Sequence, residues 1–289
     1  MLDVSPSRSC ISPAGHARHI CRPEVVITQL HTSRITPARR FAISDVHGHL
    51  HPLRAQLDAH QLARGGHWTG GNHRLWFLGD YVDRGEEGLE VVDLVRRLQV
   101  EAAEAGGSIT PLLGNHELQF LAALHFGDRD HAGGRSSWLS DWQRYGGVDA
   151  ELRTVSEEQV DWMTQLPLVD ADEGLLFVHS DSEGYLHLGS SVTEINAAGR
   201  EILHGREPSD WKHLHGLMTR RGDFFQQDRV ERILDALGMT RIVHGHSTLG
   251  SVFGLDREAT SRPHVYASGL VTAIDGGVFE GGSIVVAEL

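Results

Sequence analysis

Short apolar segments of this chain end in turns rich in carboxylate, amide and imidazole side chains, and the first three turns are evenly spaced. They carry Asp45, Asp80 and Asn115, which follow one another at intervals of 35 residues. Each interval also holds one helix-length segment, the pattern of parallel strands joined by crossover helices. Because parallel strands end at the same edge of a sheet, we expect these three side chains to lie close together.

The middle turn concentrates the most charge. It places Asp80, Asp83 and Arg84 within five residues. Buried charge is costly unless each group is paired or binds a metal, so this turn is either a metal and phosphate site or a solvated loop. The neighbouring turns, which add His47 and His116, favour the site.

Two later apolar segments end in histidine. Residues 174–178 lead into His179, and residues 240–243 lead into His244 and His246. Oxygen and imidazole donors without thiolate suit manganese, iron, zinc or a similar ion. Together with the earlier turns, they suffice for two metals about 3.5–4 Å apart, an arrangement that activates a bridging water and clamps a phosphate.

Five motifs occur in a fixed order: Asp45–Gly48, Gly79–Gly85, Gly114–Glu117, a segment ending at His179, and Gly245–His246. In this order they resemble the bacterial phosphoprotein phosphatase branch of the calcineurin-like metallophosphoesterase superfamily. Weaker matches at residues 162–167 and 273–277 extend the resemblance over residues 39–289. The resemblance implies an α/β fold, a sandwich of two mixed β-sheets flanked by helices.

The resemblance also implies an activity, that of a metallophosphatase acting on phosphoric monoesters. Two divalent ions would activate a hydroxide that attacks phosphorus directly, without a phosphoenzyme. Manganese is the first choice for these ions, and iron, zinc, nickel and cobalt are the alternatives. One ion would be held by Asp45, His47 and a bridging Asp80. The second ion would be held by Asp80, Asn115, His179 and His246.

Further residues match the family's catalytic positions. His116 would be the general acid that protonates the leaving oxygen, and Asp83 would orient it. Arg84 would hold the phosphate oxygens as a bidentate donor. A second phosphate-binding arginine is expected at Arg220 or Arg221, and Arg220 is the better match.

Asp181 departs from the family pattern, which has two small residues after the histidine that ends the fourth motif. Its carboxylate either caps local backbone or reaches into the site, where it would select substrates that present a hydrogen-bond donor or a cation. The residues expected to contact substrate are therefore Arg84, Asn115, Arg220, Arg221 and Asp181.

The composition fits one domain with a sizeable core, since the chain has 289 residues and is 40% hydrophobic. We predict a single catalytic domain at residues 38–289, because the five motifs must share one site, and a disordered leader at residues 1–37. Cys10 and Cys21 both precede the first predicted strand, so no thiol holds the core, which fits a reducing cytoplasm.

The net charge of −13 bears on partners. It argues against nucleic acid or an anionic membrane as the main partner and favours a soluble protein with local positive clamps. The partner that the resemblance implies is a phosphorylated protein or small molecule. The oligomeric state stays open.

Helices are expected from apolar residues at helical spacing and from glycines at segment ends, at residues 52–62, 89–105 and 230–237. Residues 126–167 suggest a helical cap, and residues 181–215 suggest an irregular stretch; both would shape substrate choice. The C-terminal segments 270–274 and 283–286 are expected to pair as an antiparallel hairpin.

The sequence leaves the substrate open. The resemblance favours a phosphoprotein carrying phosphate on Ser, Thr or Tyr. The alternative is a small-molecule phosphate, such as a nucleotide, a dinucleoside polyphosphate, or a sugar or nucleoside metabolite of a biosynthetic pathway. A binding module without catalysis is disfavoured, because every ligand position and His116 are filled.

Overall fold

The computed structural model describes residues 37–130 and 136–289. The predicted leader lies outside the described residues, except for Pro37. Residues Pro37–Leu289 form one compact unit, which contains all five motifs. Among the helices described, none is both long and apolar enough to cross a membrane.

The first sheet has four strands in the order β11 (Val286–Glu288), β1 (Arg40–Ile43), β4 (Arg74–Phe77) and β5 (Ser108–Pro111). Strands β1, β4 and β5 are parallel, and β11 is antiparallel to β1. The parallel arrangement inferred from the 35-residue spacing is therefore confirmed, and the turns that follow these three strands lie at one edge of the sheet.

The second sheet has five strands in the order β6 (Val169–Asp172), β7 (Leu175–Val178), β8 (Arg241–His244), β10 (Val271–Ala273) and β9 (His264–Tyr266). Strands β7, β8 and β10 are parallel, whereas β6 and β9 form antiparallel edges. A small hairpin, β2 (Ala63–Arg64) with β3 (His67–Trp68), was not expected because two-residue strands leave no periodic signal.

The two sheets pack face to face around a compact apolar layer. Trp76 of the first sheet stacks on Phe177 of the second, with ring centroids 4.2 Å apart. Ala42 and Val243 lie in the same buried cluster, while the alternate residues of β1, including Phe41, join the cluster beneath the helices. This period-two division of side chains confirms the predicted sandwich of two mixed sheets.

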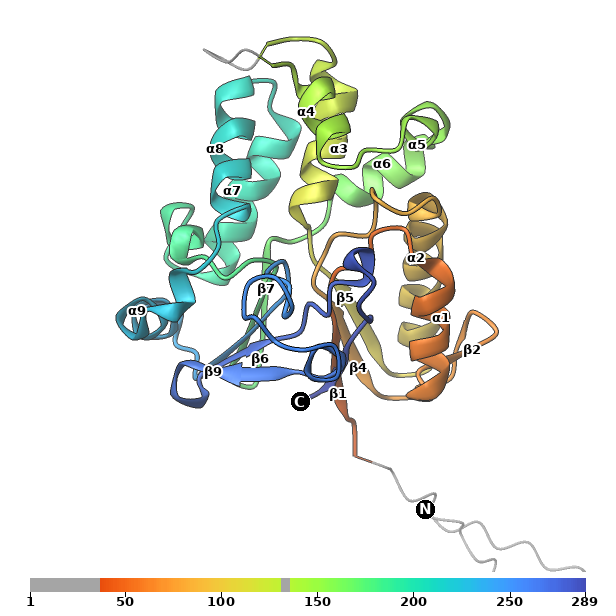
Figure 1. The fold of residues 1–289 in the computed structure, drawn as a ribbon, viewed down its shortest axis with the longest axis vertical. Coiled ribbons are helices and arrows are strands. Elements are labelled where there is room, and N and C mark those ends of the chain that lie inside the picture. The colour runs from red at the N-terminus through yellow and green to blue at the C-terminus, as the bar shows by residue number, and fades with distance from the viewer. Residues whose placement is uncertain (1–36, 131–135) are drawn as a thin grey trace, which may run out of the picture. The chain divides into compact units, whose positions relative to one another are not determined.

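Helices α1 (Leu50–Ala59) and α2 (Gly88–Glu104) lie side by side along the outer side of the first sheet (Figure 1). Helix α1 ends three residues before the predicted end, because Gln61 adopts φ 59° and the Leu62 amide turns back to bond Leu57. Helix α9 (Gln227–Leu237) ends at Gly238, whose φ of 67° suits glycine.

Helices gather beyond the carboxyl ends of the parallel strands (Figure 1): α3 (Asn115–Phe126), α4 (Trp138–Arg144), α5 (Asp149–Thr154), α6 (Glu157–Thr164), α7 (Val192–His204) and α8 (Pro208–Met218). The expectation of irregular structure over residues 181–215 was wrong, since α7 and α8 fill most of it. Helix α7 buries Ile195, Gly199 and Leu203 at four-residue intervals, and the Ser191 hydroxyl caps its first turn.

The predicted C-terminal hairpin was also wrong. Strand β10 pairs with β8 in the second sheet, whereas β11 pairs with β1 in the first. The connecting segment crosses between the sheets in a glycine-rich turn, in which the Gly282 amide donates to the Gly277 carbonyl. A Cβ atom on Gly276 would lie 2.1 Å from the Ser283 carbonyl oxygen, so only glycine allows this crossing.

Candidate metal centre

The turns at the strand ends hold their polar side chains in left-handed backbone conformations. The non-glycine site residues with positive φ are His47 (47°), Asp80 (56°), Asp83 (68°), Arg84 (69°) and His246 (63°). Such conformations are costly for residues with a Cβ and persist where the surrounding structure imposes them, most often at functional sites.

Glycines let the ends of β4 and β5 approach each other closely. A Cβ atom on Gly79 would lie 2.6 Å from the Gly114 Cα atom, and one on Gly114 would lie 2.2 Å from Asp80 Oδ1. Both distances are too short for a side chain, so these glycines bring Asp80 and Asn115 together.

The structure brings the six predicted ligands into one buried cluster. One ligand atom each from Asp45, Asp80, His179 and His246 lies within 4.8 Å of the others, and so does one each from His47, Asp80 and His116. Asn115 Oδ1 lies 2.9 Å from His179 Nε2. Asp80 belongs to both groups, as a bridging ligand requires.

Backbone carbonyls fix the protonation of the ligand histidines. Nδ1 of His47 bonds the Val82 carbonyl at 3.2 Å, and Nδ1 of His179 bonds the Leu78 carbonyl at 2.8 Å. A carbonyl only accepts, so Nδ1 carries the proton and Nε2 presents a lone pair to the cluster. By the same argument, the 3.3 Å contact from His246 Nε2 to the Thr219 carbonyl leaves Nδ1 as its ligand atom.

Two features of this cluster fit a metal. His47 Nε2 is buried and has no hydrogen-bond partner. Nε2 of His179 and Oδ1 of Asn115 both present lone pairs at 2.9 Å, a repulsive contact that a shared cation makes favourable. The oxygen and imidazole donors therefore suit divalent ions.

The electrostatics of the histidines and carboxylates agree with this fit. Burial, together with nearby positive charges, lowers the pKa values of His47, His179 and His246, so each imidazole is neutral, as metal binding requires. Burial and the charge of Asp45 raise the pKa of Asp80 well above its usual range. Burial also disfavours the charged form of Asp45, but hydrogen bonds from the Ser44 hydroxyl and the His246 backbone amide lower its pKa. Two adjacent buried carboxylates need a cation to be charged together.

Glu117 organises the loop that carries Asp80, a role the sequence analysis missed. Its carboxylate is fully buried and accepts the backbone N–H groups of Asp80, Tyr81, Val82 and Gly114 at 2.7 to 3.2 Å. Burial raises its pKa to about 7 despite these donors. The place of Glu117 in the third motif was the only indication of this role in the sequence. The spacing of residues does not reveal that a side chain bonds a loop 35 residues away.

Glu117→Gln should lower the free energy of unfolding of the metal-free protein by about 1–3 kcal/mol, because an amide NH₂ then faces backbone donors. Metal affinity should fall about 10-fold as the Asp80 loop loosens. Urea unfolding and metal titration at about pH 8, where wild-type Glu117 is charged, measure both. Glu194→Gln is the control, since Glu194 accepts a backbone N–H at the surface. Wild-type behaviour of Glu117→Gln would contradict the role.

His116, Asp83 and Arg84 form one hydrogen-bonded unit beside the ligands. His116 Nδ1 lies 2.7 Å from Asp83 Oδ2, and its Nε2 accepts from Arg84 Nη2 at 3.0 Å. Trp142 donates its indole N–H to the other oxygen of Asp83 at 2.8 Å. Burial raises the pKa of Asp83 to about 8, against the opposing effects of Trp142 and Arg84.

Phe279, in the loop between β10 and β11, packs against the Arg84 side chain. The guanidinium carbon lies 3.6 Å from the centre of the Phe279 ring, and this ring also contacts the edge of His47. Cation–π contact keeps the guanidinium at the site. The sequence analysis missed Phe279, because nothing in a glycine-rich segment indicates which distant side chain it will face.

The two candidate arginines differ in position. Arg221 Nη2 donates to the His246 carbonyl at 3.1 Å, and its charge helps to lower the pKa values of His179 and His246. Arg220 is 43% exposed and pairs with Asp223 at 3.6 Å. The structure thus brings Arg221 to the centre, although the sequence match ranked Arg220 first.

Both carboxylate oxygens of Asp181 are engaged within the fold. One accepts the Gly222 amide and the other accepts the Ser247 hydroxyl. Asp181 is fully buried, and it ties the loop after α8 to the loop after β8. This geometry corresponds to the backbone-capping alternative rather than to a group that faces substrate.

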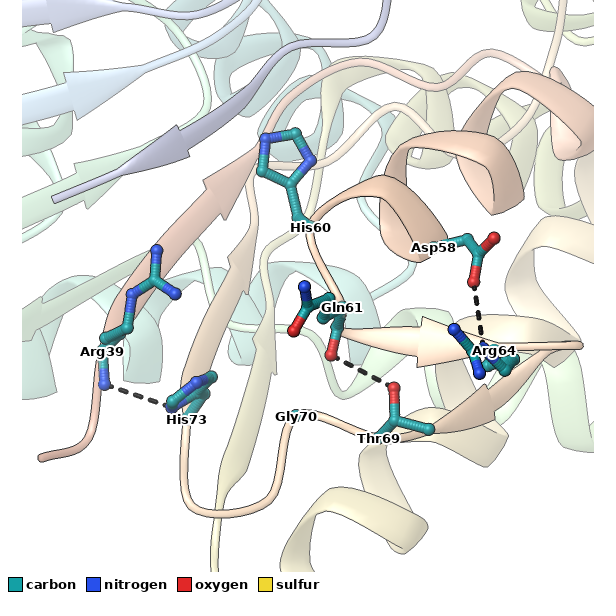
Figure 2. Close-up of a pocket in the computed structure, with 8 residues that line it drawn as sticks. All are labelled: Arg39, Asp58, His60, Gln61, Arg64, Thr69, Gly70 and His73. Carbon is teal, nitrogen blue, oxygen red and sulfur yellow. Dashed lines mark hydrogen bonds and ion pairs between the residues drawn. The ribbon is translucent and has the colours of Figure 1, made fainter. Parts of the chain in front are cut away.

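A separate cavity of about 330 Å³ lies at the opposite end of the first sheet (Figure 2). Its lining includes Arg39 and His73, which directly precede β1 and β4, and the Arg64–Asp58 ion pair. It contains none of the predicted site residues, which follow the other ends of these strands.

Comparison with known proteins identifies the family. The calcineurin-like phosphoesterase family matches residues 38–248, a range that includes all six predicted ligands. The chain is 28% identical over 197 residues to a symmetrical bis(5'-nucleosyl)-tetraphosphatase of Pseudomonas entomophila, covering 63% of this chain and 60% of that protein. It is 39% identical over 83 residues to Shewanella-like protein phosphatase 2 of Arabidopsis thaliana, covering 28% of this chain and 21% of the relative.

The fold has a solved counterpart in the cold-active protein-tyrosine phosphatase of a psychrophilic Shewanella. The TM-score is 0.65 at 21% identity, and the match covers 86% of this chain and 74% of that one. The chain spans only about three fifths of the tetraphosphatase's length. The family match nevertheless covers residues 38–248, well over half of the chain, and the chain belongs to the calcineurin-like phosphoesterase family.

Proposed function

We propose that this protein is a metal-dependent phosphatase that hydrolyses phosphate monoesters. The observation that carries the proposal is the buried cluster of six oxygen and imidazole donors directly beside the Asp83–His116–Arg84 unit. Two divalent ions, manganese first, would supply the charge that activates a water and clamps the phosphate.

The side chains around the ions have separate tasks. Arg84 and Arg221 carry positive charge on either side of the cluster and would hold phosphate oxygens, with Asn115 as a further contact. His116 would give a proton to the leaving oxygen, and Asp83, bonded to its other nitrogen, would keep the ring in place. Arg84 would turn from His116 Nε2 towards the phosphate when substrate binds.

Phosphoproteins are the favoured substrates, with phosphate on Ser, Thr or Tyr. The Asp83–His116 pair supports this choice, because an alkoxide is a poor leaving group that needs a proton. A phosphate leaving group, as in a dinucleoside polyphosphate, has far less need of one.

Dinucleoside polyphosphates are the second candidate. The observation in their favour is the similarity to symmetrical tetraphosphatases over 63% of this chain. The same cluster of donors would serve both reactions, so we expect the surrounding surface to decide the substrate.

A substrate panel tests the proposal. Metal-free protein should be inactive, and added Mn²⁺ should restore hydrolysis of nitrophenyl phosphate. Phosphopeptides should then show the highest kcat/KM in a panel that includes a dinucleoside tetraphosphate, a nucleotide and a sugar phosphate. A tetraphosphate preference would establish the second candidate, and no metal-dependent hydrolysis of any ester would refute the proposal.

A further inference from the structure

We propose that Trp142 is a positioning residue, which fixes Asp83 and through it the orientation of His116. This inference rests on the proposed phosphatase function. Trp142 lies in α4, within the helical cap predicted at residues 126–167, and its indole bonds directly to the acid–base pair.

The hydrogen bonds form a chain of three side chains. The Trp142 indole donates to Asp83 Oδ1 at 2.8 Å, and Asp83 Oδ2 lies 2.7 Å from His116 Nδ1. Asp83 is fully buried, and His116 is 2% exposed. With one donor at each oxygen, the carboxylate plane is fixed, and so is the direction of His116 Nε2.

Packing holds the indole ring in place. Trp142 is fully buried, and its ring contacts the edge of Phe120, which lies on α3 one turn after His116. On the other side the backbone passes so closely that a Cβ atom on Gly147 would lie 2.3 Å from the ring. The ring therefore has little freedom to turn away from Asp83.

The segment around Trp142 bonds the same loop at two more points. The Gly146 carbonyl accepts the Arg84 amide at 2.7 Å, and the Glu151 carboxylate accepts the Gly88 amide. Residues 142–151 thus bond the loop that carries Asp83 and Arg84 at three points. Trp142 is the member of this segment that bonds a side chain of the acid–base pair.

Trp142→Phe tests the inference, because it keeps an aromatic ring and removes the N–H donor together with part of the indole ring, a loss of packing that the control below shares. Since a misplaced acid matters most for poor leaving groups, kcat on an alkyl phosphate should fall about 10-fold, while kcat on nitrophenyl phosphate should stay within about twofold. KM and metal content should not change. The matched control is Trp211→Phe in α8, which removes a buried indole's bond to the Gly205 carbonyl and should alter neither rate.

A double variant and an NMR measurement complete the test. If Trp142 acts through Asp83, Trp142→Phe should cause no further loss in the Asp83→Asn background. The indole N–H resonance of Trp142 should differ between wild type and Asp83→Asn. This comparison tests the contact even if Trp142→Phe does not fold. Equal losses on both esters, or an unmoved indole resonance, would overturn the inference. Absence of wild-type hydrolysis would instead refute the phosphatase function itself.

Discussion

Asp80→Asn should abolish binding of both metal ions and reduce phosphatase activity on the order of 10³-fold or more. Asp80 is the one residue shared by both groups of ligand atoms. A neutral amide cannot bridge two cations as a carboxylate does. Metal content of the purified variant and its activity with added Mn²⁺ are the measurements.

Thermal unfolding gives a readout of this substitution that does not depend on activity. Metal should raise the melting temperature of wild type, since a metal concentration 100 times Kd adds about 2.7 kcal/mol to the free energy of unfolding. The melting temperature of Asp80→Asn should not change when metal is added. The metal-free variant should be at least as stable as metal-free wild type, because a neutral amide avoids the cost of protonating the Asp80 carboxylate when it is buried next to Asp45. Asp58→Asn, at an exposed ion pair, is the control. Normal metal-induced stabilisation of Asp80→Asn would show that the site lies elsewhere.

His116→Asn should retain both metal ions and lose about 10²- to 10⁴-fold in kcat on phosphoserine and other alkyl phosphates. The loss on nitrophenyl phosphate should be much smaller, and the loss on a dinucleoside tetraphosphate smaller still, because these leaving groups need little protonation. Rates on the three substrates, with metal content measured in parallel, check this expectation.

The metal measurement matters because an imidazole nitrogen of His116 lies within 4.8 Å of ligand atoms of His47 and Asp80. Loss of a metal ion from His116→Asn would assign His116 as a ligand instead of an acid. An unchanged rate on alkyl phosphates would refute both roles. His51→Asn is the matched control, since the His51 side chain is 82% exposed and lies outside the cluster.

The choice between the two candidate arginines shows where sequence reasoning reached its limit. Motif similarity located the segment but ranked Arg220 above Arg221. Neighbouring residues in a loop point in different directions, and only the fold determines which one faces the site. Arg221 donates a hydrogen bond to the His246 carbonyl, whereas Arg220 forms an ion pair with Asp223.

Asp181 presents the same limit in another form. The sequence shows a carboxylate beside His179 and allows it either a structural or a substrate-facing position. Its two hydrogen-bond partners, Gly222 and Ser247, are 41 and 66 residues away along the chain. No local pattern indicates these partners.

The sequence by itself determined the five strands that lead into the site, the turns that follow them and the six clustered donors. These features follow from short-range rules: apolar runs form buried strands, and parallel strands place their ends at one edge. Only the tertiary structure decided that β11 joins β1 instead of β10, and that Glu117, Phe279 and Trp142 hold the site. Each of these contacts joins residues at least 35 positions apart, where the packing of the whole domain, and not local periodicity, selects the partner.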